Sequence, residues 1–456
     1  MVREGLESSA TGQECRVAVT RGRLLFLSVA LVAVVVLAVP LGNRKLTEYV
    51  ESDAFRRELD KQTSKGLHFE GEYQTIRRTG LLTVETDGFK ARNGVKAFKT
   101  LSTGQVDAKF NPWGIFLRRW ELEYIHIPSG RAEIQTYEPK PENKPPKPWY
   151  AVVLPERVHL NRVVCDSADV TWQLRGRKAG FFETYLLITP YGRDFEYRAE
   201  RGVMKTGIVP DLVLHQLHLL ITKELLTLYD LELAPSAKSS GRIRVSGWAG
   251  MKNDKSVSAE MNFSEIPVDP WIPKAWARLI KGRASGNVAW QGTDMRMESS
   301  SGWGEVRLED GRVAGARFLE DVASLIGKPI DTVSLSRFSL GFEWKYPRVQ
   351  VKQMDIEAEG VFRLKGTATI NKKSLSGELQ LGVTPEYLEW LPKAERVFTR
   401  QRDGYLWTTV QLGGTMADPQ EDLSPRVAEL LKKSPAAALG LLIRGIGEWF
   451  ENSVAE

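Results

Sequence analysis

Residues 257–263 of this chain read Val-Ser-Ala-Glu-Met-Asn-Phe. Apolar and polar side chains alternate over the whole stretch, so an extended backbone would carry Val257, Met261 and Phe263 on one side and the polar residues on the other. This is the pattern of a β-strand with one dry face and one wet face. The same alternation recurs in three further segments: 168–174, 194–200 and 354–359. Half-buried strands are therefore expected to be the main structural element.

Glycine, asparagine, aspartate and proline separate the expected strands at short intervals. Further strands are expected at 119–127, 158–164, 225–233, 242–248, 283–290, 305–308 and 361–370. Short helices are expected at 53–65, 272–281, 316–326 and 385–398, and a longer C-terminal helix at 425–450. Asp310-Gly311 predicts a tight hairpin, Asn371 to Ser374 a second turn, and the five prolines in 138–148 an extended surface loop. We expect a mainly β protein, an elongated and curled antiparallel sheet with few helices.

One segment, 24–41, departs from this pattern because it contains no charge and a single polar residue, Ser28. As a helix it would extend roughly 27 Å, close to the hydrocarbon thickness of a bilayer. We expect 1–23 to be a short cytoplasmic tail, 24–42 a transmembrane signal anchor and the remainder an exported body. The alternatives are a cleaved signal peptide, with Val36 and Ala38 as its small-residue pair, and a buried core helix.

Composition limits the classes of partner and the redox chemistry. The chain has 63 basic and 57 acidic residues, a net charge of +6, which is a mixed surface rather than the basic stripe of a nucleic-acid-binding protein. Such a mild excess suits loose contact with anionic lipid headgroups. The two cysteines, Cys15 and Cys165, would lie on opposite sides of the membrane, so neither a disulfide nor a cysteine metal site is expected.

No set of residues predicts catalysis. His215 and His218 are three apart, which on a strand directs them to opposite faces and argues against a shared metal. Asp355, Glu357 and Glu359 share one strand face, for which a solvated acidic surface is the simpler interpretation. The chain has no Gly-x-Ser-x-Gly motif and no phosphate-binding glycine loop. We therefore expect a protein that is not an enzyme and carries no cofactor.

The C-terminal half carries a series of short glycine-rich motifs. They are Trp303 to Gly315, Leu364 to Ile370, Leu375 to Gly382, and Val410 to Pro419 with Gly413-Gly414-Thr415 near its end. In this order they resemble the C-terminal region of AsmA-like proteins, which are related to TamB- and YdbH-like proteins. The N-terminal half is similar too, in its anchor, its short helix and segments 88–94, 106–110 and 125–127.

The resemblance implies an inner-membrane protein with a periplasmic β-groove that carries phospholipid acyl chains and supports outer-membrane assembly. It divides the chain into a β-groove region at 43–300, a C-terminal β region at 301–423 and an amphipathic helix at 424–456. Residues on the dry faces are the candidates for lining the groove: Val170, Trp172, Phe195, Tyr197, Val257, Met261, Phe263 and Val288. The expected partners are phospholipid, the inner membrane and other envelope proteins.

Two alternatives remain open from the sequence. One is a scaffold or regulator of the envelope, in which the dry faces form a closed core, and the other is an exported enzyme. The C-terminal helix also has two interpretations, since 436–450 would either lie on a membrane surface or cover the last strand edge of the sheet.

Overall fold

The computed structural model describes residues 43–67, 70–94, 98–111, 120–134, 158–174, 176–192, 194–251, 255–272, 277, 280–293, 297–314, 332–415 and 419–432. Within these residues, no helix is both long and apolar enough to cross a membrane. The anchor expected at 24–42, the proline-rich loop at 138–148 and the helix expected at 316–326 lie outside the described residues.

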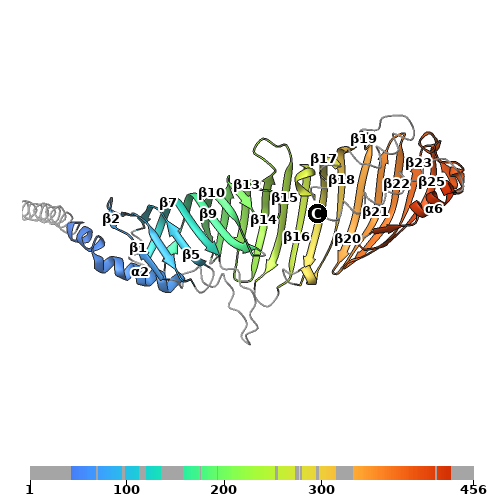
Figure 1. Ribbon diagram of the computed structural model, residues 1–456. Helices are drawn as coiled ribbons and strands as arrows, with labels where there is room; N and C mark the ends of the chain where they lie inside the picture. The colour runs from blue at the N-terminus through green and yellow to red at the C-terminus, as the bar shows by residue number, and fades with distance from the viewer. Residues whose placement is uncertain are drawn as a thin grey trace, which may run out of the picture.

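The described strands form a single, mostly antiparallel sheet of 26 strands. Figure 1 shows them side by side along an elongated body, from helix α2 (Asp53–Leu67) at one end to helix α6 (Leu423–Lys432) at the other. The expectation of a mainly β protein built on one large antiparallel sheet is confirmed.

The N-terminal strands do not follow chain order. They are β1 (Glu70–Tyr73), β2 (Ile76–Arg78), β3 (Thr83–Thr86), β4 (Phe89–Arg92), β5 (Phe98–Thr103), β6 (Val106–Phe110), β7 (Trp120–Ile134), β8 (Val158–Leu160) and β9 (Val163–Leu174). Two ribbons, β1-β4-β5 and β2-β3-β6, both end on the long strand β7. Strand β7 then pairs in parallel with β8 and β9, so the two ribbons join the rest of the sheet through this parallel junction.

From β9 onward the sheet is a meander in which each long strand pairs with the long strands before and after it. The strands are β10 (Arg177–Tyr191), β11 (Asp194–Glu200), β12 (Val203–Lys205), β13 (Leu212–Ile221), β14 (Leu225–Ala234), β15 (Arg242–Gly250), β16 (Val257–Pro267), β17 (Ile280–Gly292), β18 (Ser300–Ala314), β19 (Thr332–Ser334), β20 (Arg337–Lys345), β21 (Arg348–Ala358), β22 (Phe362–Asn371), β23 (Ser374–Val383), β24 (Arg400–Arg402), β25 (Tyr405–Gly414) and β26 (Pro419–Glu421). The short 3-10 helices are η2 (Asp269–Trp271), η3 (Met297–Ser299), η4 (Pro385–Leu388) and η5 (Ala394–Arg396).

Several expected elements agree closely with the structure. The helix expected at 53–65 is α2, and the strands expected at 225–233 and 242–248 are β14 and β15. The turn expected at Asn371 to Ser374 joins β22 to β23, and Lys372 takes the left-handed conformation with a φ of 54°. Local sequence is enough in these cases because period-two alternation and turn residues both act over a few positions.

Three expectations differ from the structure. Asp310-Gly311 does not form a hairpin, since both residues lie inside β18, where the pairing with β17 shifts register between Lys281 and Arg283. Asp310 has a φ of 51°, so the left-handed residue makes a bulge instead of a turn. The helix expected at 272–281 does not extend to its predicted end, because Ile280 is the first residue of strand β17. The helix expected at 385–398 is present only as η4 and η5.

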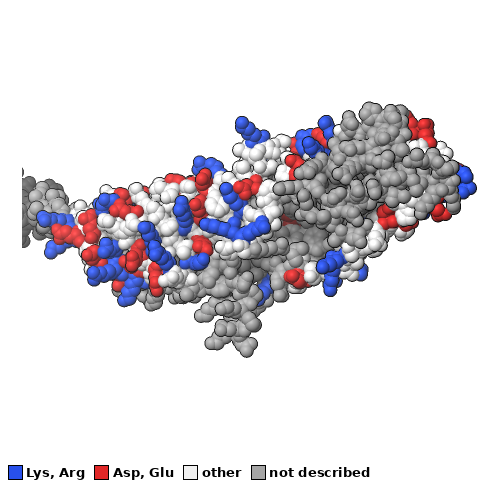
Figure 2. Space-filling model, viewed as in Figure 1, with Lys and Arg blue, Asp and Glu red and all other residues white. Residues whose placement is uncertain are grey.

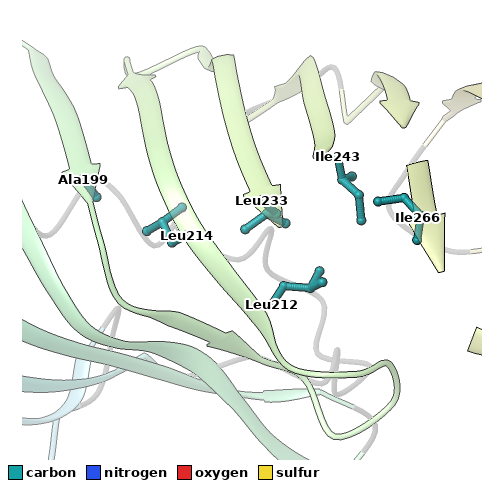
Figure 3. Packing of buried hydrophobic residues seen from close by; sticks show 6 residues of the cluster. All are labelled: Ala199, Leu212, Leu214, Leu233, Ile243 and Ile266. Carbon is teal, nitrogen blue, oxygen red and sulfur yellow. The ribbon is translucent and has the colours of Figure 1, made fainter. Parts of the chain in front are cut away.

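The best-packed part of the core lies in the middle of the sheet. Six buried residues from five strands form it: Ala199, Leu212, Leu214, Leu233, Ile243 and Ile266. Figure 3 shows their side chains lying along successive strands on the same side of the sheet. Among the described residues that lie outside strands, Trp271 of η2 packs against this cluster.

Both ends of the sheet are covered by helices. At the N-terminal end, the backbone N–H groups of Gly71 and Tyr73 in β1 donate to Ser64 Oγ (3.0 Å) and Asp60 Oδ1 (2.7 Å) of α2. At the C-terminal end, the N–H of Gln411 in β25 donates to Asp422 Oδ1 (2.7 Å), and the guanidinium of Arg426 in α6 donates to the carbonyl oxygen of Thr409. Side chains of α2, of α6 and of Asp422 just before α6 thus satisfy backbone groups that an edge strand would expose.

Candidate functional site

The strand registers place all eight candidate residues on one face of the sheet. In an antiparallel pair, directly opposite residues share a face. Met261 lies opposite Val245 and Val288, and Phe263 lies opposite Ile243, which belongs to the core cluster around Leu214. The same face therefore carries Val257, two positions before Ala259 and four before Met261.

The other candidates reach the same face through β10 to β13. Tyr197 and Phe195 of β11 lie opposite Leu219 and Ile221 of β13. Val170 and Trp172 of β9 lie opposite Phe181 and Ala179 of β10, and Phe181 packs against the core cluster. We call this side of the sheet the apolar face. Its side chains in β13 to β18 are Leu214, Leu217, Leu219, Ile221, Leu226, Leu228, Leu231, Leu233, Ile243, Val245, Ala249, Val257, Ala259, Met261, Phe263, Val288, Trp290, Val306 and Leu308.

The apolar face continues without a polar interruption through β20 to β23. Phe338, Leu340, Phe342 and Trp344 alternate along β20 and lie opposite β18 and β21 residues of the same face. It goes on with Val349, Val351, Met354, Ile356, Leu364, Ala368, Ile370, Leu375, Leu379 and Leu381. Most of these side chains are only half-buried, including seven of the eight candidates, while Val257 is buried. A closed core would bury them fully.

Glycines on this face let aromatic rings lie flat against the sheet. A methyl group built on Gly304 in β18 would lie 2.7 Å from Cζ of Phe342 in β20. One built on Gly286 in β17 would lie 2.9 Å from Cζ of Phe263 in β16, and one on Gly302 would overlap the indole of Trp344. Such distances mean that each ring occupies the space above the glycine of the neighbouring strand. The aromatic side chains therefore form a low floor instead of projecting from it.

Two polar groups on the apolar face, the Tyr197 hydroxyl and the Trp290 indole N–H, show how little their surroundings solvate them. Burial raises the pKa of Tyr197 to about 12, because the phenolate would be poorly solvated there. Nε1 of Trp290 is buried and donates to no acceptor in the described part of the chain. A buried indole N–H without a partner costs about 1–3 kcal/mol, and on an apolar face it is the kind of group that an entering hydrogen-bond acceptor would satisfy.

The opposite face carries the charges, many of them paired across strands. Arg363 of β22 donates from Nε and Nη2 to both carboxylate oxygens of Asp355 in β21, at 3.0 and 2.9 Å. Arg337 of β20 contacts Asp355 at 3.3 Å and Glu357 at 3.8 Å. Burial alone would raise the pKa of Asp355, but the hydrogen bonds from Arg363 and Arg337 outweigh it and lower that pKa. Asp355 and Glu357 are therefore an ion-pair network rather than the freely solvated acidic surface expected from the sequence.

Histidines on this polar face are also paired with carboxylates. His126 of β7 lies 2.7 Å from Asp166 of β9 and 3.5 Å from Asp107 of β6, and these contacts raise the pKa of His126. His218 of β13 contacts Glu196 of β11 at 2.5 Å. No group of His, Cys, Asp and Glu residues with metal-binding geometry occurs among the residues the structure describes.

The sequence missed several residues of the apolar face that the structure brings into contact. Phe342 and Trp344 are among them, although the alternation of Phe338, Leu340, Phe342 and Trp344 is as regular as that of β16. The pairing of these rings with glycines is invisible in the sequence because the partners are about 40 positions apart. Comparisons with protein-family models, with curated proteins and with solved structures find no match for this chain.

Proposed function

We propose that this chain is an AsmA-like protein of the bacterial cell envelope that binds phospholipid acyl chains on its apolar face and moves them between membranes. The observation that carries the proposal is the apolar face itself. It runs across β9 to β23 as mostly half-buried side chains, without a polar row, while the paired charges lie on the opposite side. A contiguous apolar surface whose side chains stay partly exposed is typical of an interaction site.

The energetics of an acyl chain favour such a surface for transfer. Each CH₂ group exposed to water costs about 0.8 kcal/mol, so an unassisted lipid pays a large penalty when it leaves a bilayer. A floor of Leu, Val, Phe and Trp side chains replaces the contacts that the chain loses, and the two environments then differ little in free energy. Such a transfer needs no nucleophile, acid or metal, which agrees with a non-enzymatic protein without a cofactor.

The proposed location follows from the apolar segment at 24–42, which would anchor the N-terminal end in the inner membrane and leave the body in the periplasm. The longest row of paired strands, from β1 to β25, extends about 80 Å at about 4.8 Å per strand. A body of this length would cover a large part of an envelope. Contact with a second envelope protein or with the outer membrane would complete the path.

Site-specific photocrosslinking tests the proposal. A photoreactive amino acid at Phe195 or Met261 should crosslink phospholipid in cells, because both side chains lie on the apolar face. The matched control is Glu260, which neighbours Met261 but lies on the opposite face. Lipid on Met261 and not on Glu260 supports the proposal. Equal crosslinking at the two positions, or none at either together with no co-purified phospholipid, would favour the envelope scaffold instead.

A further inference from the structure

One long side of the sheet, formed by alternate hairpin turns, carries a set of unpaired cations. The turns joining β13 to β14, β15 to β16, β20 to β21 and β22 to β23 lie along this side (Figure 1). Six exposed basic residues occupy these turns or the strand ends beside them: Lys223, Lys255, Lys345, Arg348, Lys372 and Lys373. We call this set the basic rim. None of the six makes an ion pair with a described residue, whereas cations such as Arg363 and Arg244 on the polar face are paired.

Exposed aromatic side chains collect along the same side. Tyr191 is 61% exposed at the turn from β10 to β11, and Tyr346 is 48% exposed between Lys345 and Arg348. Trp248 and Trp303, 40% and 48% exposed, lie within about 10 Å of the rim, two to three residues from the ends of β15 and β18. Large aromatic side chains are costly to expose in water, so their collection on one side indicates a binding surface.

The opposite side of the sheet does not share this character. Its described turns between β14 and β15, β16 and β17, and β21 and β22 carry Lys238, Asp269 and Glu359, one cation against two anions. Figure 2 also shows Lys and Arg interleaved with Asp and Glu over the N-terminal strands. The described turns of the opposite side therefore lack the excess of positive charge that the basic rim carries, and other exposed cations near that side, such as Lys281 and Arg312, lie inside strands. Glu224 is the acidic residue in the described part of the turns of the basic rim, and Glu298 lies on the same side as the rim, in the connection between β17 and β18.

We propose that the basic rim docks along an anionic membrane surface, with its tyrosines and tryptophans in the headgroup region. Lysine and arginine beside Trp and Tyr are the combination that proteins place at a membrane interface, where the cations meet phosphates and the amphipathic rings lie between water and acyl chains. From Lys223 to Lys373 the rim covers about ten strands, or about 43 Å. A body held in this way lies alongside a membrane, with one edge of the apolar face next to it.

This inference goes beyond acyl-chain binding, and the two are tested separately. The full chain is placed in nanodiscs of phosphatidylcholine, and its flotation is measured with vesicles of phosphatidylcholine alone or with added phosphatidylglycerol. We expect binding to the anionic vesicles that weakens steeply between about 0.1 M and about 1 M salt, because the electrostatic screening length shortens as salt is added. Each cation at such a surface contributes about fivefold. The rim variant Lys345→Glu, Arg348→Glu, Lys372→Glu and Lys373→Glu should therefore lower the partition coefficient at least about a hundredfold.

The matched control reverses four exposed cations near the opposite side: Lys178→Glu, Lys238→Glu, Lys281→Glu and Arg312→Glu. It changes the net charge by the same amount, and its binding should stay within about threefold of the parent chain. Equal loss in the two variants, equal binding to neutral vesicles, or no binding to anionic vesicles would overturn the proposal, and the last result would assign the rim to an acidic protein.

A second pair of measurements separates this surface from the apolar face and from misfolding. The rim variant should still crosslink lipid from Met261, which shows that it is folded and that the apolar face still works. Trp303→Ser should weaken vesicle binding without changing its salt dependence, because it removes an apolar contact and no charge. If the chain still binds vesicles but Met261 crosslinks no lipid, the proposal of acyl-chain binding is refuted and the proposal of membrane docking by the basic rim stands.

Discussion

Gly304→Ala should disturb the apolar face through a single aromatic ring. The added methyl group would lie 2.7 Å from Cζ and 3.1 Å from Cε1 of Phe342, and 3.0 Å from the carbonyl oxygen of Asn287. The backbone contact is tight but tolerable, so the ring is the part that must move. Overpacking of this kind costs about 1–3 kcal/mol. Replacing glycine with alanine returns about 0.4–1 kcal/mol by restricting the unfolded chain, so we expect a net loss of about 1–2 kcal/mol.

The measurement is urea unfolding of Gly304→Ala in two backgrounds, the parent chain and Phe342→Leu. Without the ring, the alanine should cost less than about 0.5 kcal/mol, a coupling of at least about 1 kcal/mol between the two positions. Gly413→Ala is the matched control, since nothing lies within 4 Å of a methyl group there, and it should leave stability unchanged or slightly raised. An equal cost of Gly304→Ala in both backgrounds would refute the flat-ring arrangement. If the ring rises from the floor, the same variant should also reduce lipid crosslinking from Met261.

Three further outcomes follow from charged and buried groups. Arg363→Met should cost about 1.5–3 kcal/mol in urea unfolding, because Asp355, at 15% side-chain exposure, loses both hydrogen bonds from Arg363 and keeps the 3.3 Å contact with Arg337, and adding Asp355→Asn should recover part of the loss. The pKa of His126 is raised, chiefly by its hydrogen bond with Asp166. The stability that this pair contributes is therefore complete below the unfolded pKa of about 6.5 and is lost as pH rises through the higher folded pKa. In urea unfolding at several pH values, Asp166→Asn should reduce this pH dependence of stability. Tyr197 should ionise near pH 12, seen as the difference in tyrosinate absorbance between the parent chain and Tyr197→Phe, and ionisation near pH 10 would contradict its burial.

Alternation predicted the faces of the strands well because it depends on the pleat alone. Val257, Met261 and Phe263 had to share a face once β16 was extended, whatever its neighbours were. Alternation alone does not show that the apolar sides of strands as distant as β9 and β17 join into one surface. The register between neighbouring strands decides this. Register depends on turns and bulges, such as the shift between Leu214 and Gln216 in β13, which keeps Leu214 and Leu217 on the same side.

The errors have a shared physical cause. Asp310 adopts a left-handed conformation, as the Asp-Gly pair indicated, but such a residue suits a bulge as well as a hairpin turn. The partner strand decides between them, and β17 continues past this point to Ile280. The same limit applies to Gly304 and Phe342, whose contact joins strands far apart in the sequence. Local pattern gives the conformation of a residue, while its role depends on the strand beside it.

The two ends of the sheet help to explain why its middle is left half-buried. Edge strands invite pairing with other chains, and here α2 satisfies the N–H groups of Gly71 and Tyr73 while Asp422 and Arg426 satisfy β25. The described helix α6 thus covers part of this edge, while residues 436–450, for which the two roles are expected, lie outside the described residues. Leu388, Leu391 and Phe398 also pack with Leu381 and Leu406 of the apolar face, which closes that face at this end. The fold thus protects the positions where exposure leads to aggregation. Half-buried side chains such as Met261, Val288 and Phe342 lie between these covers, where the proposed acyl chain would contact them without opening the sheet.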